Sequence, residues 1–230
     1  MVINMQIDFS GFQLFTSCIH PTFHHQSLMI HGGARSHDIF HTLRSILAEY
    51  HVGSISFDCI GHGQSDGQFS DSSLNSRTQQ ALAILQYINT HIKTCIGVSM
   101  GAYNALKLSK LLTLDALVLI VPGVYTPDAY DIPFGTSFRQ IIRQTNSWQN
   151  SDAWEIIHQF KGKLLIVSAQ DDEVIPDEIP LNLFNAATQC QWKHHLIIPN
   201  AQHKHILNYI FETPQLKYKF LYYLKKCLSI

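Results

Sequence analysis

The sequence predicts an α/β fold in which a mostly parallel central sheet is covered by helices on both faces. Apolar runs of strand length alternate with segments of helical periodicity along most of the 230 residues. The run at 116–121 is wholly apolar, and the runs at 163–168 and before Ser99 are nearly so, which is typical of strands buried on both faces. Parallel strands need long crossover connections, and the helical segments between the runs supply them.

The composition is that of one globular domain spanning residues 1–230. Hydrophobic residues make up 46% of the chain and charged residues 14%, which excludes a disordered protein. The net charge of -1 gives no electrostatic basis for binding nucleic acid, and no apolar run approaches the roughly 20 residues of a membrane span. The first nine residues do not resemble a signal peptide, and the five cysteines are scattered and odd in number. We therefore expect a cytoplasmic protein with reduced cysteines and no stable membrane anchor.

The first strands are short and separated by clear turn signals. Residues 3–9 and 13–18 are predicted to form an antiparallel pair, joined by a turn at Ser10-Gly11. Residues 27–30 form a short buried strand, and alternating apolar positions predict a further strand at 54–58.

The loop after the strand at 27–30 reads His31-Gly32-Gly33, and Ser36 stands where it could cap the next helix. Two glycines just past a strand permit close approach of another backbone. The N–H of Gly33 is therefore either a donor to an oxyanion or part of an ordinary strand-to-helix turn. The segment by itself favours neither interpretation.

Residues 58–67 form a glycine-rich turn after the next strand. Asp58, His62 and Ser65 are side chains of the kind that bond to the backbone of their own turn, so we interpret them as mainly structural. A long amphipathic helix is predicted at 74–92. Its expected apolar face consists of Ala81, Leu82, Leu85 and Ile88.

The chain is organised around Gly97-Val98-Ser99-Met100-Gly101, which lies between an apolar strand and a helix-forming run. A G-x-S-x-G motif in this strand–turn–helix context holds the serine hydroxyl up and exposed. Flanking glycines remove the clashes that side chains would make in so tight a turn. The backbone N–H of Met100 belongs to the first helical turn, where N–H groups lack partners and favour negative charge. Ser99 is thus a candidate nucleophile, and Met100 a candidate oxyanion donor.

The alternation of strands and helices breaks between residues 124 and 160. This stretch contains two short predicted helices, at 138–143 and 152–160, and is rich in aromatic residues. A long insertion in a compact domain is usually functional. We interpret it as a small lid over the serine, because binding pockets are mostly apolar and aromatic; the alternative is a loop that the aromatics anchor to the sheet edge. The candidate substrate-contacting residues are Tyr125, Phe134, Phe138 and Trp148.

Two acids and a histidine follow the last predicted strands. The strand at 163–168 opens into Asp171-Asp172, and an acid at the carboxyl end of a strand can orient a histidine. The two adjacent aspartates leave that choice open. His203 lies on the loop after the strand at 192–198, where its ring is free to reach the serine, and a closing helix is expected to start near His205 and run through Leu224.

The fourteen histidines do not predict a metal site. The adjacent pairs His24-His25 and His194-His195 diverge, and His203-x-His205 lacks chelating i, i+4 spacing. The sequence contains neither H-E-x-x-H nor C-x-x-C. We therefore expect no metal and no cofactor.

Taken together, these stretches resemble the α/β-hydrolase superfamily over nearly the whole chain. The resemblance rests on His31-Gly32-Gly33, Asp58-x-x-Gly61-His62-Gly63-x-Ser65, the Ser99 motif, Asp172-x-x-Ile175-Pro176 and Asn200-Ala201-Gln202-His203, in the family's order. The turn at 58–67 looks most like the small serine esterases that include cinnamoyl/feruloyl esterases and monoacylglycerol-lipase-like enzymes. The resemblance implies an α/β-hydrolase fold, and the aromatic or acyl esters of these enzymes would suit the inserted aromatic segment.

The resemblance also implies roles for the candidate residues. Ser99 would be the nucleophile and His203 the base, while Asp172 fits the family's acid because it lies four residues before Pro176, with Asp171 as the fallback. Gly33 and Met100 would be the oxyanion donors. The chain departs from the pattern at Met100, where the esterase subgroup often has glutamine. It departs again at Asn200, where the family often has glycine, although asparagine tolerates left-handed backbone.

The leading hypothesis is a serine hydrolase that cleaves a small-molecule carboxylic ester through an acyl-enzyme. Two alternatives remain. One is a thioesterase or acyltransferase that uses the same triad. The other is a ligand-binding protein that keeps the fold and the pocket without turnover.

Overall fold

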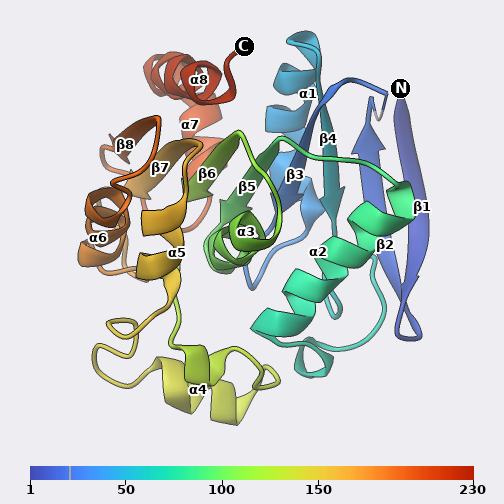
Figure 1. Ribbon diagram of the computed structural model, residues 1–230, viewed down its shortest axis with the longest axis vertical. Helices are drawn as coiled ribbons and strands as arrows, with labels where there is room; N and C mark the ends of the chain where they lie inside the picture. The colour runs from blue at the N-terminus through green and yellow to red at the C-terminus, as the bar shows by residue number, and fades with distance from the viewer. Residues whose placement is uncertain (21) are drawn as a thin grey trace.

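The computed structural model describes residues 1–20 and 22–230, in which the strands form one eight-stranded sheet (Figure 1). The strands are β1 (Val2–Phe9), β2 (Phe12–Ile19), β3 (His25–Ile30), β4 (Val52–Phe57), β5 (Thr94–Val98), β6 (Ala116–Ile120), β7 (Lys163–Ala169) and β8 (Trp192–Ile198). Their order across the sheet is β1-β2-β4-β3-β5-β6-β7-β8. The first two pairings in that order are antiparallel, and all the others are parallel.

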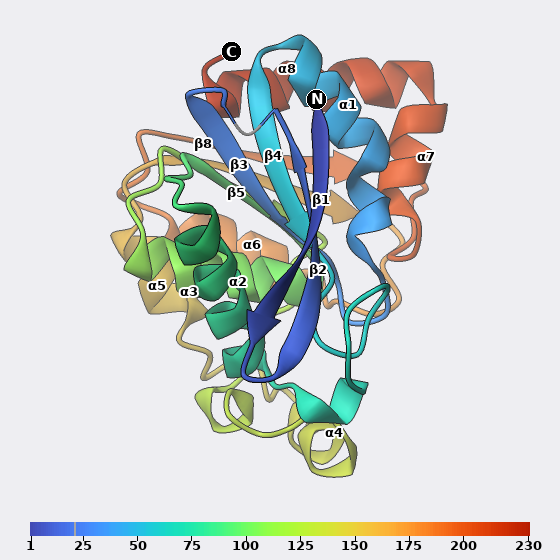
Figure 2. The ribbon, with the colours of Figure 1, turned by 90° about the vertical axis from the view of Figure 1, so that its right-hand side faces the viewer.

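Helices cover both faces of the sheet. They are α1 (His41–Glu49), α2 (Leu74–Ile88), α3 (Met100–Leu111), α4 (Thr136–Ile142), α5 (Ala153–Gln159), α6 (Glu178–Ala186), α7 (Ile206–Glu212) and α8 (Pro214–Leu228). Figure 2 shows α2, α3, α5 and α6 on one side, with α1, α7 and α8 on the other. Among the described residues, three 3₁₀ turns connect these elements: η1 (His37–Phe40), η2 (Phe69–Asp71) and η3 (Pro127–Ala129).

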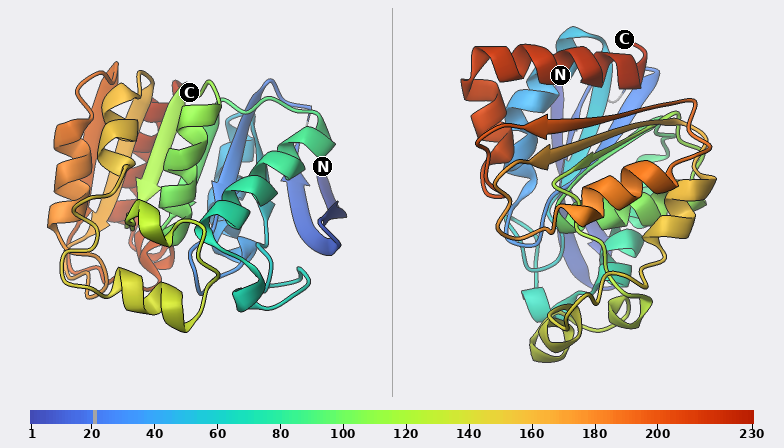
Figure 3. Two further views of the ribbon diagram at one scale, coloured as in Figure 1. Left: turned by 60° about the horizontal axis from the view of Figure 1, so that its bottom comes forward. Right: turned by 90° about the vertical axis from the view of Figure 1, so that its left-hand side faces the viewer.

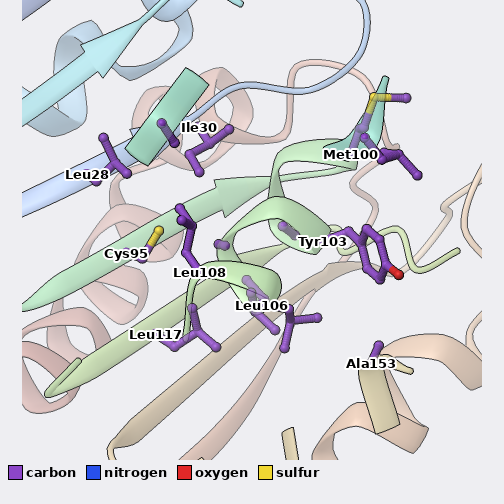
Figure 4. Close-up of a cluster of buried hydrophobic side chains, with 14 of the residues drawn as sticks. Leu28, Ile30, Cys95, Met100, Tyr103, Leu106, Leu108, Leu117 and Ala153 are labelled. Carbon is purple, nitrogen blue, oxygen red and sulfur yellow. The ribbon is translucent and has the colours of Figure 1, made fainter. Parts of the chain in front are cut away.

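The sheet divides the apolar core in two, because successive side chains of a strand point to opposite faces. Leu117 and Leu119 of β6 join the cluster under α2, α3, α5 and α6, whereas Val118 and Ile120 join the cluster under α1, α7 and α8. Figure 4 shows part of the first cluster, where Leu117 lies near Leu106 and Leu108 of α3. This arrangement confirms the predicted α/β fold with a mostly parallel sheet.

Several predicted helix boundaries are wrong, each for a local reason. The helix predicted over 74–92 stops at Ile88, because Asn89 takes a left-handed conformation with φ of 53° and its N–H closes onto the last turn. The closing helix is two helices, since Thr213 precedes Pro214 and is extended. Ser36 does not cap α1, because its hydroxyl donates to Asp38 and η1 separates it from the helix. The helix α6 has no counterpart among the predicted elements.

The segment between β6 and β7 leaves the sheet at the carboxyl end of β6. It contains η3, α4 and α5, and Figure 3 shows α4 standing clear of the sheet while α5 packs beside α3. Several hydrogen bonds fix this segment to α2, to α3 and to the residues just before α2. The N–H of Phe134 donates to the Ser72 carbonyl at 2.8 Å, and the Asp152 carboxylate pairs with Lys107 of α3 at 2.6 Å. No helix within the described residues is long and apolar enough to cross a membrane.

Candidate active site

Ser99 occupies the sharp turn between β5 and α3. Its backbone has φ of 54° and ψ of -118°, a strained conformation for a residue with a side chain. A Cβ on Gly97 would run into the backbone of Gly101 and Ala102, and one on Gly101 would run into the carbonyls of Ile30 and His31. The two flanking glycines therefore allow the strand, the helix and the loop after β3 to meet around the serine.

A chain of hydrogen bonds joins Ser99, His203 and Asp172. Nε2 of His203 lies 3.0 Å from Oγ of Ser99, and Nδ1 lies 3.0 Å from Oδ2 of Asp172. Asp172 is thus the aspartate that contacts the histidine. Asp171 is exposed, and its carboxylate makes no hydrogen bond within the described part of the chain; only its backbone N–H bonds, to the Ala201 carbonyl.

The surroundings of Asp172 keep it ionised. Burial by itself would raise the pKa of this carboxyl group, but the hydrogen bond from His203 and the N–H groups of Ile175 and Val174 lower the pKa below its usual 3.8. An ionised Asp172 accepts a hydrogen bond from the Nδ1–H of His203, which leaves Nε2 as the acceptor that faces the Ser99 hydroxyl. The backbone N–H of His203 in turn donates to the Glu173 carboxylate at 3.3 Å, an acid that the sequence did not single out.

The loop after β3 runs directly past the serine. A Cβ on Gly32 would lie 3.3 Å from Cβ of Ser99, and one on Gly33 would lie 3.1 Å from Cε of Met100. The backbone N–H groups of Gly33 and Met100 donate to no acceptor within the described residues. Both are therefore available to a negatively charged oxygen formed near Ser99.

Each of the three carbonyl groups of this loop has a fixed partner. The carbonyl of His31 accepts from Arg77 of α2. That of Gly32 accepts from Nδ1 of His31 at 2.6 Å, and that of Gly33 from Nε2 of His62 at 2.8 Å. In a trans peptide the N–H points opposite to the C=O. Holding the Gly32 carbonyl therefore also fixes the direction of the Gly33 N–H.

The ring of His31 performs this task as a neutral group. Its Nε2 accepts the N–H of Cys59 at 3.0 Å, so Nδ1 carries the proton that is donated to Gly32. Burial, together with the nearby charges of Arg77 and His62, lowers the pKa of His31 well below 6.5. If the ring were protonated, the N–H at Nε2 would face the N–H of Cys59 and the hydrogen bond between them would be lost. The lowered pKa of His31 therefore preserves both hydrogen bonds of the ring.

The glycine-rich turn at 58–67 is held mainly by its own side chains. Asp58 accepts hydrogen bonds from the N–H and the ring of His37 and from the N–H of Gln64. The hydroxyl of Ser65 donates to the Asp58 carbonyl at 2.6 Å and accepts the N–H of Phe15 at 2.8 Å. His62 reaches beyond the turn to Gly33, and this contact depends on folding of the two loops against each other.

The four aromatic lid candidates lie in different surroundings. Phe134 and Phe138 are 1% and 2% exposed, and they pack edge-to-face on each other as anchors of the inserted segment. Trp148 packs against Trp154 and lines a groove beside α6. Tyr125 is half-buried, with its hydroxyl near Gly123, whose N–H donates to the Ser99 carbonyl. Tyr125 thus lies close to the serine turn, and Phe134 reaches the loop after β3 through Phe69, which stacks on it and packs against the ring of His62.

Other parts of the described chain offer less chemistry. A hollow of about 570 Å³ lined by Lys93, Asp115 and Lys163 lies at the amino ends of the strands, away from Ser99. No cluster of three or more histidine, cysteine, aspartate or glutamate side chains that could hold a metal ion occurs within residues 1–20 and 22–230.

A strained serine at a strand–helix turn, bonded to a histidine that an aspartate orients, is the arrangement that acyl-transfer enzymes use on α/β folds. The chain belongs to the alpha/beta hydrolase family, whose model matches residues 28–208. A search of curated proteins found no match.

Solved structures share the fold at low sequence identity. Est1E from Butyrivibrio proteoclasticus, solved with ferulic acid bound, has a TM-score of 0.71 and 21% identity over 98% of this chain and 100% of its own. A Paleococcus ferrophilus monoacylglycerol lipase has a TM-score of 0.72 and 16% identity over 94% of this chain and 98% of its own. A thioesterase domain from the curacin biosynthetic pathway has a TM-score of 0.68 and 14% identity over 91% of this chain and 96% of its own.

Proposed function

We propose that the protein is a serine carboxylesterase that hydrolyses a small or medium acyl or aromatic ester through an acyl-enzyme. The observation that carries the proposal is the hydrogen-bonded chain from Ser99 through His203 to Asp172, beside two backbone N–H groups that have no partner in the described part of the chain. Similar folds in an enzyme with bound ferulic acid and in a monoacylglycerol lipase support the substrate class, as does the aromatic insertion.

In the acylation step, Nε2 of His203 takes the proton of Ser99 while Oγ attacks the ester carbonyl carbon. The carbonyl oxygen becomes an oxyanion, which accepts hydrogen bonds from the N–H groups of Gly33 and Met100, each worth about 3 kcal/mol in comparable sites. The protonated His203, stabilised by ionised Asp172, then gives its proton to the leaving alcohol. The C–O bond breaks, and the acyl group remains on Ser99.

Deacylation repeats the sequence with water. His203 takes a proton from the water molecule, whose oxygen attacks the acyl carbon and forms a second oxyanion at the same donors. Collapse of this intermediate returns the proton from His203 to Oγ of Ser99 and releases the carboxylic acid. No cofactor takes part in this sequence.

The test is covalent labelling with a fluorophosphonate, read by intact mass, followed by a panel of esters. We expect one adduct on the wild type, none on Ser99→Ala and slow labelling of His203→Ala. Ser168 is a matched control, because its hydroxyl also lies 2.8 Å from a histidine nitrogen, that of His195, yet no acid contacts that ring within the described residues. Ser168→Ala should label like the wild type. Ester turnover that persists in Ser99→Ala would contradict the assignment.

A thioesterase or acyltransferase on the same residues is the second candidate, supported by the fold of the curacin-pathway thioesterase domain. Rates on matched oxygen esters and thioesters with one acyl group separate the two. Tight binding of a ligand without labelling of Ser99 would instead indicate a non-catalytic binding protein.

We also propose that the protein works in a reducing compartment such as the cytoplasm, which suits the five free cysteines.

A further inference from the structure

Arg77 of α2 is a buried cation that pairs with no carboxylate among the described residues. The residue is 0% exposed, and no salt bridge within the described part of the chain includes it. Its Nη2 donates to the His31 carbonyl, its Nη1 lies 3.2 Å from Sδ of Met100, and its Nε has no partner there. An arginine side chain carries its positive charge delocalised over a planar group with five N–H donors.

Burying such a residue lowers the stability of the folded protein. A buried charge costs several kcal/mol unless good partners satisfy it, and a thioether is a weak acceptor. The buried positions of α2 around Arg77 are apolar, as at Leu74 and Ala81, or neutral and polar, as at Thr78 and Gln80, so this face of the helix does not require a cation. Stability by itself therefore does not explain an arginine at this position.

Two groups to which Arg77 is hydrogen-bonded belong to the two segments that supply the oxyanion donors, and the thiol of Cys59 also lies beside the guanidinium. The His31 carbonyl lies two residues before Gly33, and Met100 is itself the second donor residue. The side chain of Met100 also packs on Gly33, so it lies between Arg77 and the loop. The same His31 carbonyl abuts Gly101 in the first turn of α3. Arg77 thus acts where the loop after β3 meets the start of α3.

We propose that Arg77 is a positioning residue for the oxyanion site, which holds the loop at 31–33 and the Met100 backbone in register and places a positive charge behind them. The inference rests on the proposed function, because it assigns these N–H groups to an oxyanion. A fixed cation in a water-excluded region favours negative charge that develops in the transition state more than it favours a neutral ester. Its effect should therefore fall on kcat and leave KM nearly unchanged.

The experiment compares Arg77→Met, Arg77→Gln and Arg77→Lys with the wild type. In the two neutral variants we expect kcat to fall about 10- to 100-fold, while KM changes by less than about threefold. The affinity for a trifluoromethyl ketone, which forms an oxyanion on Ser99, should fall in parallel with kcat. Arg77→Lys should recover part of both losses because it restores the charge.

Arg44 of α1 is the matched control. It is also a buried arginine, but it donates to Ser17 and Ser54, in a different part of the sheet. Arg44→Met should lower stability while kcat of the folded protein stays near the wild-type value. A neutral Arg77 variant with wild-type kcat, or one in which kcat, KM and stability change as they do in Arg44→Met, overturns the inference.

Amide hydrogen exchange provides a readout that does not depend on turnover. Peptides covering residues 30–36 should exchange faster in Arg77→Met and Arg77→Gln than in the wild type or in Arg44→Met, because the His31 carbonyl loses its donor. Unchanged exchange in this segment counts against the positioning role. Absence of both labelling and hydrolysis in the wild type would instead contradict the proposed function, and the exchange data would still decide whether Arg77 positions the loop.

Discussion

At the scale of single residues, the site depends on a few unusual backbone and side-chain states. Ser99 has φ of 54°, and Asn200, just before the loop that carries His203, has φ of 55°. Asparagine tolerates this left-handed conformation, so it can take the place of the glycine that the family often has here. Asp172 adds a carboxylate whose four acceptor positions serve three donors: His203, Val174 and Ile175. The histidine is thereby held between the acid and the serine.

The first prediction concerns the choice between the two aspartates. Asp172→Asn should lower kcat about 10⁴-fold, because an amide at this position favours the wrong tautomer of His203. Asp171→Asn should stay within about threefold of the wild type, since the Asp171 side chain is exposed. Steady-state kinetics on one ester measures both variants. A larger loss in Asp171→Asn than in Asp172→Asn would contradict the assignment of the acid.

At the scale of elements, β5, the turn at Ser99 and α3 form one unit against which the loop after β3 packs. The backbone of α3 approaches β5 and the end of β3 so closely that neither Gly97 nor Gly101 has room for a Cβ. The nucleophile and both oxyanion donors therefore depend on one packing contact between elements. This contact is close to the position where Arg77 of α2 reaches the His31 carbonyl.

The second prediction tests this packing. Gly101→Ala should cost about 3 kcal/mol in the free energy of unfolding, because the new methyl group meets backbone carbonyls that cannot move aside. It should also lower kcat about 100-fold by displacing the Met100 N–H from the serine. Urea unfolding and kinetics on the same preparation measure both effects.

Gly135 provides the control for this substitution. A Cβ there meets nothing within 4 Å, and the backbone is extended. Gly135→Ala should therefore change stability by less than about 0.5 kcal/mol. If both variants changed stability by the same amount, the close packing of Gly101 on the Ile30 and His31 carbonyls would not restrict this position.

At the scale of the whole molecule, two apolar layers on one sheet give the stability on which the strained site depends. Buried carboxylates connect this stability to pH. Burial would raise the pKa of Asp58, but hydrogen bonds from the ring of His37 and from the N–H groups of Gln64 and His37 lower it below its usual 3.8. Asp172 has a lowered pKa for a similar reason. A carboxyl group with a lowered folded-state pKa stabilises the fold above its unfolded pKa and loses that contribution as the pH falls.

The third prediction concerns how the free energy of unfolding changes with pH. The free energy of unfolding should fall in two ranges as the pH drops. It should fall below about pH 6.5, where the ring of His31 binds a proton in the unfolded chain but not in the folded one, and again below about pH 4, where the carboxyl groups become protonated. Asp58→Asn should be less stable than the wild type by about 3 kcal/mol at pH 7, and this gap should narrow as the pH falls. Urea unfolding at a series of pH values measures the gap, with the exposed Glu49→Gln expected to follow the wild-type curve. A gap that widens toward low pH would contradict the account.

Local signals in the sequence allowed most of the strands and the position of Ser99 to be predicted. Alternation or continuous apolar character marks each strand, and the strand at 192–198 has the predicted bounds. Helix ends were predicted less well, because single residues such as Asn89 and Pro214 decide them against the periodicity. Arg77 is visible in the sequence as a charged residue on the buried face of α2. Its position on that face does not show which groups the arginine contacts.

The sequence by itself determined the fold class, the strand–turn–helix position of Ser99, and the order in which serine, acid and histidine follow one another. Only the tertiary structure decided that Asp172 and not Asp171 contacts His203, that His31 and His62 hold the loop at Gly33, and that Arg77 lies behind Met100. The physical reason is the distance along the chain over which each kind of interaction acts. Periodicity and turn chemistry act between near neighbours in the chain, whereas each of these contacts joins separate elements or depends on which way a side chain points in the folded protein.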